Sequence, residues 1–177
     1  MFPDALNHPK TEAGGTPEAP RGRLRGRYIG LDVGKARCGI SISDEDGRVA
    51  TPIAVVPASG VGPLAEAITK CVTALESSVY GGGSPTIAGL VVGLPLDESG
   101  GEGDAARGVR SLAHALAAIM GVPLLFEDER MTTRLAEANL VAQDVGRRKR
   151  KGVRDAAAAA LILQSFLDKM NRERPVK

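Results

Sequence analysis

Residues 27–43, RYIGLDVGKARCGISIS, decide the fold of this chain. Aliphatic residues alternate with other types in the first half of the stretch: Ile29, Leu31 and Val33 stand between Tyr28, Gly30 and Asp32. A period of two sends successive side chains to opposite faces of a sheet. Asp32 is therefore predicted at the end of a strand, on the face opposite the aliphatic side chains. After a turn that contains Gly34, the alternation resumes at Cys38, which predicts a second strand returning beside the first.

Length and composition favour a single domain. The chain has 177 residues and 43% hydrophobic content, enough for one core. Residues 1–26 are rich in Pro, Gly, Glu and Arg and lack apolar periodicity, so we expect a disordered tail, followed by a domain over residues 27–170 and a flexible C-terminus over 171–177. Aromatic residues make up only 3%, which argues against an RNA-reading sheet that stacks bases on aromatic rings.

Cysteine usage and hydropathy point to a cytoplasmic protein. Cys38 and Cys71 lie far apart in apolar segments, so we expect reduced, buried thiols and neither a disulfide framework nor a zinc site. No run of about 18 apolar residues could span a bilayer, and the N-terminal segment lacks the apolar part of a secretory signal. The net charge of +2 is mild, but basic residues cluster at 21–27 and 147–154.

The order of elements predicts an α/β fold. Residues 48–56 complete an antiparallel meander of three strands. Apolar periodicity then predicts the following elements: a helix at 63–79, a buried strand at 86–96, a helix ending near 120, a short strand at 122–127, a helix after Thr132 or Thr133, and a last helix at 153–170. The expected result is a five-stranded mixed sheet, in which right-handed crossovers add two parallel strands to the meander. The basic segment 143–152 is expected to be too polar to pack.

Acidic residues follow the strands of this predicted sheet. Sites in open α/β sheets form at the carboxyl ends of the parallel strands, and Asp32, Asp128 or Glu129, and Asp155 all map to that edge. Carboxylate oxygens favour Mg²⁺ or Mn²⁺ over zinc. Each acid also has a simpler explanation, because Asp155 could be a helix-start charge and Glu129 could pair with Arg130. Asp32 fits such an explanation least well, since a partly buried carboxylate needs a partner.

Four motifs, DVGKARCGIS, VVGLPLDESG, DERMTT and DAAAAALIL, occur in an order that resembles the YqgF family of bacterial nucleases. This family is also called RuvX, and its members are described as Holliday junction resolvases or pre-16S rRNA nucleases. The similarity covers about residues 27–168. It implies a ribonuclease-H-like fold with Asp32 as the first-strand acid, Glu129 as the second and Asp155 as the last-helix acid. Asp128 stays open as an alternative to Glu129.

The resemblance also implies a mechanism. Two divalent ions, Mg²⁺ or Mn²⁺, would activate a water molecule and stabilise the leaving oxygen of an in-line phosphodiester cleavage, with no protein nucleophile. Asp32 would bridge the ions, while Glu129 and Asp155 would each hold one. Candidate contacts to substrate phosphates are Lys35, Arg130, Arg147, Arg148, Lys149, Arg150 and Lys151. Lys35 and Arg130 could equally form surface ion pairs, and the loop at 97–103 could gate the substrate, position it, or simply connect two elements.

The substrate and the class of function remain open on sequence alone. Processing of the 5′ end of pre-16S rRNA in ribosome biogenesis is the expected activity, and cleavage of a four-way DNA junction is the alternative. A two-fold symmetric junction calls for a homodimer, whereas a monomer could process rRNA. An actin-like or sugar-kinase-like nucleotide-binding module shares the opening hairpin, but such proteins place ATP between two domains and this chain has room for one. An inactive nucleic-acid-binding scaffold is the third class.

Overall fold

The computed structural model describes residues 26–79, 86–130 and 149–172, with residues 75–79 and 149–155 described by their backbone alone. The strands are β1 (Arg27–Val33), β2 (Arg37–Ser43), β3 (Ala50–Pro57), β4 (Ile87–Leu94) and β5 (Leu124–Asp128). The helices are α1 (Val61–Val79), α2 (Asp104–Met120) and α4 (Lys149–Arg172). The predicted tail, apart from Gly26, and the helix expected after Thr132 or Thr133 lie outside the described residues.

The strands form one mixed sheet in the order β3-β2-β1-β4-β5. β1 pairs with β2, and β2 with β3, in antiparallel fashion, whereas β4 lies parallel to both β1 and β5. The predicted arrangement, a ribonuclease-H-like meander extended by two parallel strands, is therefore confirmed. β1 occupies the centre, so its C-terminal end lies between the ends of two neighbouring strands.

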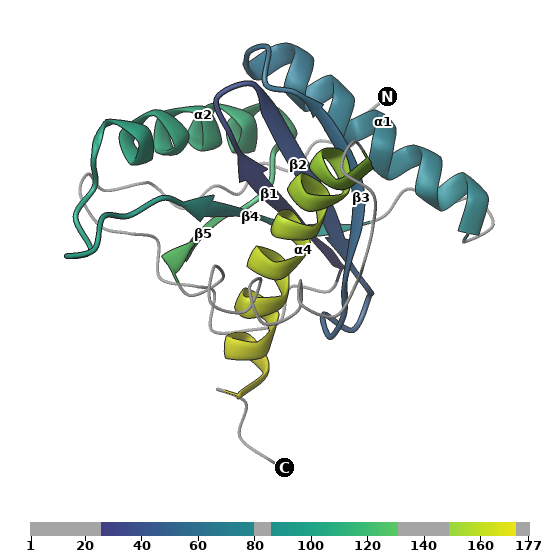
Figure 1. The fold of residues 1–177 in the computed structure, drawn as a ribbon. Coiled ribbons are helices and arrows are strands. Elements are labelled where there is room, and N and C mark those ends of the chain that lie inside the picture. Colours follow the sequence, from purple (N-terminus) through teal and green to yellow (C-terminus); the bar gives the residue numbers. More distant parts are fainter. Residues whose placement is uncertain (1–25, 80–85, 131–148, 173–177) are drawn as a thin grey trace.

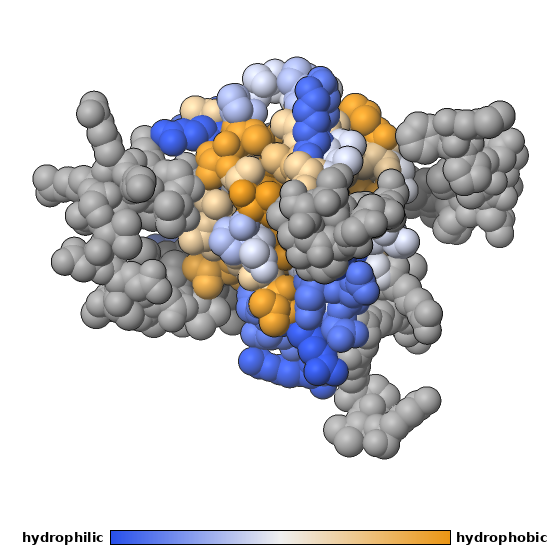
Figure 2. All heavy atoms as spheres, turned by 90° about the vertical axis from the view of Figure 1, so that its right-hand side faces the viewer, coloured by the Kyte–Doolittle hydropathy of each residue, from blue (hydrophilic) through white to orange (hydrophobic). Residues whose placement is uncertain are grey.

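The sheet is covered on both faces (Figure 1). Ile29 and Leu31 of β1 pack into a core with α1 and α2, and Tyr28 packs on the opposite face against Leu163 and Leu167 of α4. The period-two pattern of β1 thus separates two cores. None of the described helices is long and apolar enough to cross a membrane. Figure 2 views the side of the molecule on which α1, β3 and α4 lie, where apolar patches are interspersed with polar ones.

Helix α4 packs close to β1 because position 30 is glycine. A β-carbon on Gly30 would lie 2.7 Å from Cβ of Leu163 and 3.0 Å from the carbonyl oxygen of Ala159. The Oγ of Ser41 on β2 donates to that same carbonyl at 2.9 Å. The close approach brings the N-terminal half of α4 down toward the central strand, which is the half that carries position 155.

The start of α4 differs from the prediction. The helix begins at Lys149, so part of the basic segment expected to remain unpacked is helical. Lys and Arg are good helix formers, and a charged stretch can extend a helix that packs farther along its length. Asp155 is consequently six positions past the first helical residue, and the first turn of α4 holds no acid. The interpretation of Asp155 as a helix-start charge is wrong. At its other end α4 continues to Arg172, where Asn171 Nδ2 donates to the carbonyl oxygen of Gly47.

A buried carboxylate joins β5 to α4. Glu127 is only 4% exposed, and its Oε1 accepts hydrogen bonds from Ser165 Oγ at 2.6 Å and from Lys169 Nζ at 2.5 Å. We expect Lys169→Met to lower the free energy of unfolding by about 1–3 kcal/mol, because it leaves the buried charge with one neutral partner. Urea denaturation of the variant measures this loss. The double variant with Glu127→Gln should recover most of it, and no recovery would contradict the explanation.

Candidate functional site

Asp32 stands at the carboxyl end of β1, half-buried, on the face that α4 covers. The antiparallel register pairs it with Gly39 of β2. On the other side, Leu31 pairs with Val92 of β4, so Gly93 is the neighbouring position one step along the two parallel strands. Residues that lie side by side on adjacent strands point to the same face. Glycines on both neighbouring strands therefore leave room around the Asp32 carboxylate.

The side chain of Glu129 occupies the space above Gly93. Glu129 directly follows β5, and its backbone N–H donates to the carbonyl oxygen of Leu94 at 3.3 Å. A β-carbon built on Gly93 would lie 2.5 Å from Oε1 of Glu129 and 2.6 Å from Cδ1 of Ile162 on α4. The carboxyl group of Glu129 thus sits over the strand next to Asp32, so the structure brings two of the three predicted acids to the same edge of the sheet.

Asp32 and Glu129 are close enough for the negative charge of one carboxylate to disfavour ionisation of the other. Burial of Glu129, followed by the negative charges of Asp32 and Asp128, raises the pKa of its carboxyl group to about 7. Removal from water and neighbouring like charges both disfavour the ionised form of an acid. Glu129 is therefore close to half-ionised at neutral pH, and a cation placed between the acids would favour its charged form.

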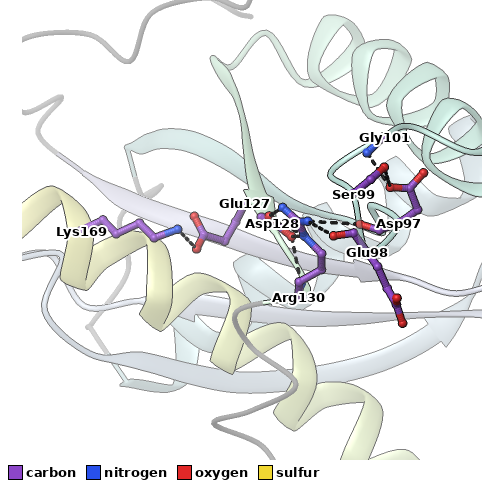
Figure 3. A network of polar contacts seen from close by, with 8 residues as sticks. All are labelled: Asp97, Glu98, Ser99, Gly101, Glu127, Asp128, Arg130 and Lys169. Atoms are coloured by element: carbon purple, nitrogen blue, oxygen red, sulfur yellow. Dashed lines mark hydrogen bonds and ion pairs between the residues drawn. The ribbon is translucent and has the colours of Figure 1, made fainter.

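Asp128 is engaged differently, as Figure 3 shows. Its carboxylate accepts hydrogen bonds from Nε and Nη2 of Arg130, the latter at 2.6 Å, and from the backbone N–H of Arg130 at 3.0 Å. These bonds hold the pKa of Asp128 below its usual value. Arg130 Nη1 also donates to the carbonyl oxygens of Asp97 and Glu98, at 3.2 and 3.1 Å. Arg130 accordingly forms an ion pair with Asp128 and not with Glu129.

Position 155 lies level with Asp32 by the register of α4 on β1. The rings of Tyr28 and Phe166 meet at a tilt with their centroids 5.5 Å apart, and Gly30 lies against Leu163 and Ala159. The helix therefore runs antiparallel to the strand. Four helical residues advance about 6 Å, close to the advance of two strand residues. One turn before Ala159, position 155 thus falls at the level of Asp32, and its side chain lies outside the described part.

Four of the remaining predicted contacts to phosphate, Lys35, Lys149, Arg150 and Lys151, fall within the described residues. Lys35 is exposed in the turn between β1 and β2, at the same end of β1 as Asp32. Lys149, Arg150 and Lys151 form the start of α4, whereas Arg147 and Arg148 lie outside the described residues. Among the side chains that the structure describes, no three His, Cys, Asp or Glu residues are close enough to hold a metal ion. Any full ligand set must include a residue beyond Asp32 and Glu129.

Cys38 is near the acids in sequence but faces the other core. Its thiol is fully buried, and burial, with a smaller effect of Asp32, raises its pKa to about 12. A thiol of that pKa stays protonated and is a poor nucleophile at neutral pH. Cys38 and Cys71 are both free, as predicted, but only Cys38 is buried, whereas Cys71 is partly exposed.

Sequence reasoning missed Gly93. This residue interrupts the apolar run of β4 at the one position where the side chain of Glu129 needs space. A glycine inside a buried strand often marks the close approach of another group, and that signal was present in the motif VVGLPL. The identity of the approaching group depends on the register between strands, which the motif does not contain.

A family model described as "RuvX: Holliday junction resolvase" matches residues 26–169, which include every element from β1 through most of α4. The chain belongs to this family. Two similar RuvX relatives carry the name "Putative pre-16S rRNA nuclease". The relative from Acidiphilium cryptum is 41% identical over 84% of this chain and 88% of its own. The relative from a Nocardioides species is 46% identical over 81% of this chain and 88% of its own.

One solved structure similar to this RuvX protein is T. thermophilus RuvC in complex with a Holliday junction substrate, 16% identical over 85% of this chain and 99% of that chain, with a TM-score of 0.45. The family description and the names of the relatives all denote enzymes that cut nucleic-acid backbones. The predicted enzyme class, a nuclease, is thereby confirmed for this member of the RuvX family.

Proposed function

We propose that this protein is a divalent-metal-dependent endonuclease that processes the 5′ end of precursor 16S rRNA, with Asp32, Glu129 and Asp155 as its metal ligands. The relatives named for pre-16S rRNA support the substrate. The observation that carries the mechanism is the Glu129 carboxyl group above Gly93, beside the strand end that holds Asp32. The negative charges of Asp32 and Glu129 disfavour each other's ionisation, and a divalent cation between the two carboxylates would offset that repulsion.

The donor set fits Mg²⁺ or Mn²⁺. All three proposed ligands are carboxylates, whose hard oxygens suit these ions, and the free cysteine of β2 points into the opposite core. When bound, such an ion polarises the scissile phosphate and lowers the pKa of an attacking water molecule. Asp32 is the proposed central ligand because it lies between glycines on both neighbouring strands.

The chain itself orients the substrate. Lys35 in the β1–β2 turn and the basic residues Lys149, Arg150 and Lys151 at the start of α4 are proposed to contact backbone phosphates on either side of the acids. Contacts of this kind fix the register of the nucleic acid without reading bases, in agreement with the scarcity of aromatic residues. The deprotonated carboxylate of Glu129 is the form that binds the ion.

Cleavage of four-way DNA junctions is the second candidate, favoured by the description of the family model. A panel of a 16S precursor fragment, a four-way junction and duplex DNA, each with Mg²⁺ or Mn²⁺, separates the two. We expect cleavage of the precursor at its 5′ side and little cleavage of the junction. Preferential, symmetric cutting of the junction by a dimer would replace the rRNA assignment with the second candidate.

Affinity for the metal should depend on pH through Glu129. Since the pKa of its carboxyl group is about 7, we expect Mn²⁺ to bind about tenfold more tightly at pH 8 than at pH 6, with release of a proton. Calorimetric titration in two buffers of different ionisation enthalpy measures both quantities. Glu129→Gln should bind Mn²⁺ weakly and without this pH dependence. An affinity of the native protein that is flat across the range would contradict the assignment.

The free energy of unfolding of the metal-free protein should fall as the pH rises, whereas the affinity for Mn²⁺ should increase. The pKa of Glu129 is higher in the folded protein than the ordinary value of 4.5, so the folded state binds the proton more tightly. The stabilisation from this group is complete below pH 4.5 and disappears as the pH rises through about 7. Bound metal should compensate for the loss at high pH.

A further inference from the structure

The guanidinium group of Arg130 joins two segments that are 30 residues apart in sequence. Nε and Nη2 bind the carboxylate of Asp128, and Nη1 binds the carbonyl oxygens of Asp97 and Glu98. Arginine has five N–H donors in a planar fork, and these contacts use four of them. Only one N–H donor of Arg130 remains for a phosphate. The other four connect the end of β5 to the loop that follows β4.

That loop, residues 97–103, is hydrogen-bonded near both of its ends. The Asp97 carboxylate closes the turn by accepting from Ser99 Oγ at 2.6 Å and from the backbone N–H of Gly101 at 2.7 Å (Figure 3). At the far end, Glu102 forms an ion pair with Arg110 of α2 and accepts a hydrogen bond from Arg107 Nη1 at its carbonyl oxygen. Hydrogen bonds at both ends restrain the loop, which favours a positioning role over that of a gate.

Glu129 lies between the two residues of this ion pair in sequence. Asp128 precedes it and Arg130 follows it; these two residues are bonded to each other, and Arg130 is also bonded to the loop. The backbone on each side of Glu129 is therefore held in place. Its side chain leaves in another direction, over Gly93.

We infer that Arg130 is a positioning residue, which clamps Asp128 and the 97–103 loop together so that Glu129 keeps its carboxyl group at the proposed metal site. Asp128 serves as the anchor of the clamp and is not a metal ligand, because its oxygens are occupied by Arg130. The inference rests on the proposed function for its effect on catalysis. It extends that function by giving the loop and Arg130 a role that is distinct from contact with the substrate.

The test compares Arg130→Gln with Lys70→Gln, a control that removes an exposed ion pair to Glu66 on α1. Of these two variants, we expect only Arg130→Gln to speed amide hydrogen exchange in residues 97–101. Its affinity for Mn²⁺, measured by calorimetry, should fall about tenfold, the usual cost of removing a group that orients a ligand. The kcat for cleavage should fall while KM for the nucleic acid stays unchanged. A phosphate contact would instead raise KM and leave exchange and Mn²⁺ affinity as they were, which would overturn the inference.

A second comparison tests the role of Asp128. With Arg130→Gln as background, adding Asp128→Asn should change Mn²⁺ affinity by less than about twofold, because the clamp is already lost. A further large loss would make Asp128 a ligand and overturn its assignment as an anchor. If the native protein cuts none of the nucleic acids, the proposed function fails. The rate of amide hydrogen exchange in the loop still tests whether Arg130 clamps the loop to Asp128. Unchanged exchange in Arg130→Gln overturns the clamp whatever the activity.

Discussion

Asp32→Asn should lower metal-dependent cleavage by about a thousandfold, equivalent to about 4 kcal/mol of transition-state stabilisation. Asparagine keeps the size of the side chain and removes its charge. Position 32 is only half-buried, at a strand end, so the fold should survive the change. The measurement is single-turnover cleavage of the precursor fragment with Mg²⁺, beside a thermal melt that verifies folding.

The same variant has a readout that does not involve cleavage. The negative charge of Asp32 helps to raise the pKa of Glu129, so its removal should shift the pH dependence of Mn²⁺ binding toward lower pH. Glu66→Gln, which neutralises an exposed acid on α1, is the matched control and should alter neither quantity. Cleavage by Asp32→Asn at the native rate would remove the metal-ligand mechanism altogether.

Gly93→Ala should damage both the site and the fold. The added methyl group would lie 2.5 Å from the Glu129 carboxyl oxygen and 2.6 Å from Ile162, closer than atoms can approach. Either Glu129 leaves the site or α4 moves away from the sheet. We expect a loss of about 1–3 kcal/mol in the free energy of unfolding, typical of overpacking. Activity should fall about a hundredfold, because a ligand displaced by about 1 Å misplaces the reacting groups.

The control for this change is Gly108→Ala on α2. A β-carbon there would meet nothing within 4 Å, and alanine in a helix interior is favoured over glycine by about 0.5–1 kcal/mol. That variant should therefore be slightly more stable and fully active. Urea denaturation and Mn²⁺ calorimetry on both proteins separate the two effects. A Gly93→Ala protein with native stability and native affinity would show that Glu129 does not need the space.

The sequence was sufficient to predict the sheet because its signals are local. The alternation in 27–33 assigned Asp32 to the face opposite Ile29 and Leu31, and the continuous apolar run of β4 indicated a strand covered on both faces. The order of elements then restricted the topology, since crossovers between parallel strands are right-handed. The acids at strand ends followed from that topology.

The contacts of the acids could not be predicted, because they depend on register and on loop geometry. Asp128 and Glu129 are adjacent in sequence, and the sequence alone does not say that Arg130 pairs with Asp128 while it also contacts the 97–103 loop. The start of α4 was misjudged for a related reason. Charge indicates exposure, but exposure is compatible with a helix whose later turns pack on the sheet.

The placement of α4 has a consequence for biosynthesis. The helix covers β1 through Ala159 and Leu163 and carries the third proposed ligand at position 155, although it is made more than 100 residues after β1. A nascent chain that has completed β1 to β5 contains every strand of the sheet but lacks the helix that packs over β1. The proposed nuclease therefore gains its full ligand set only after α4 has been synthesised.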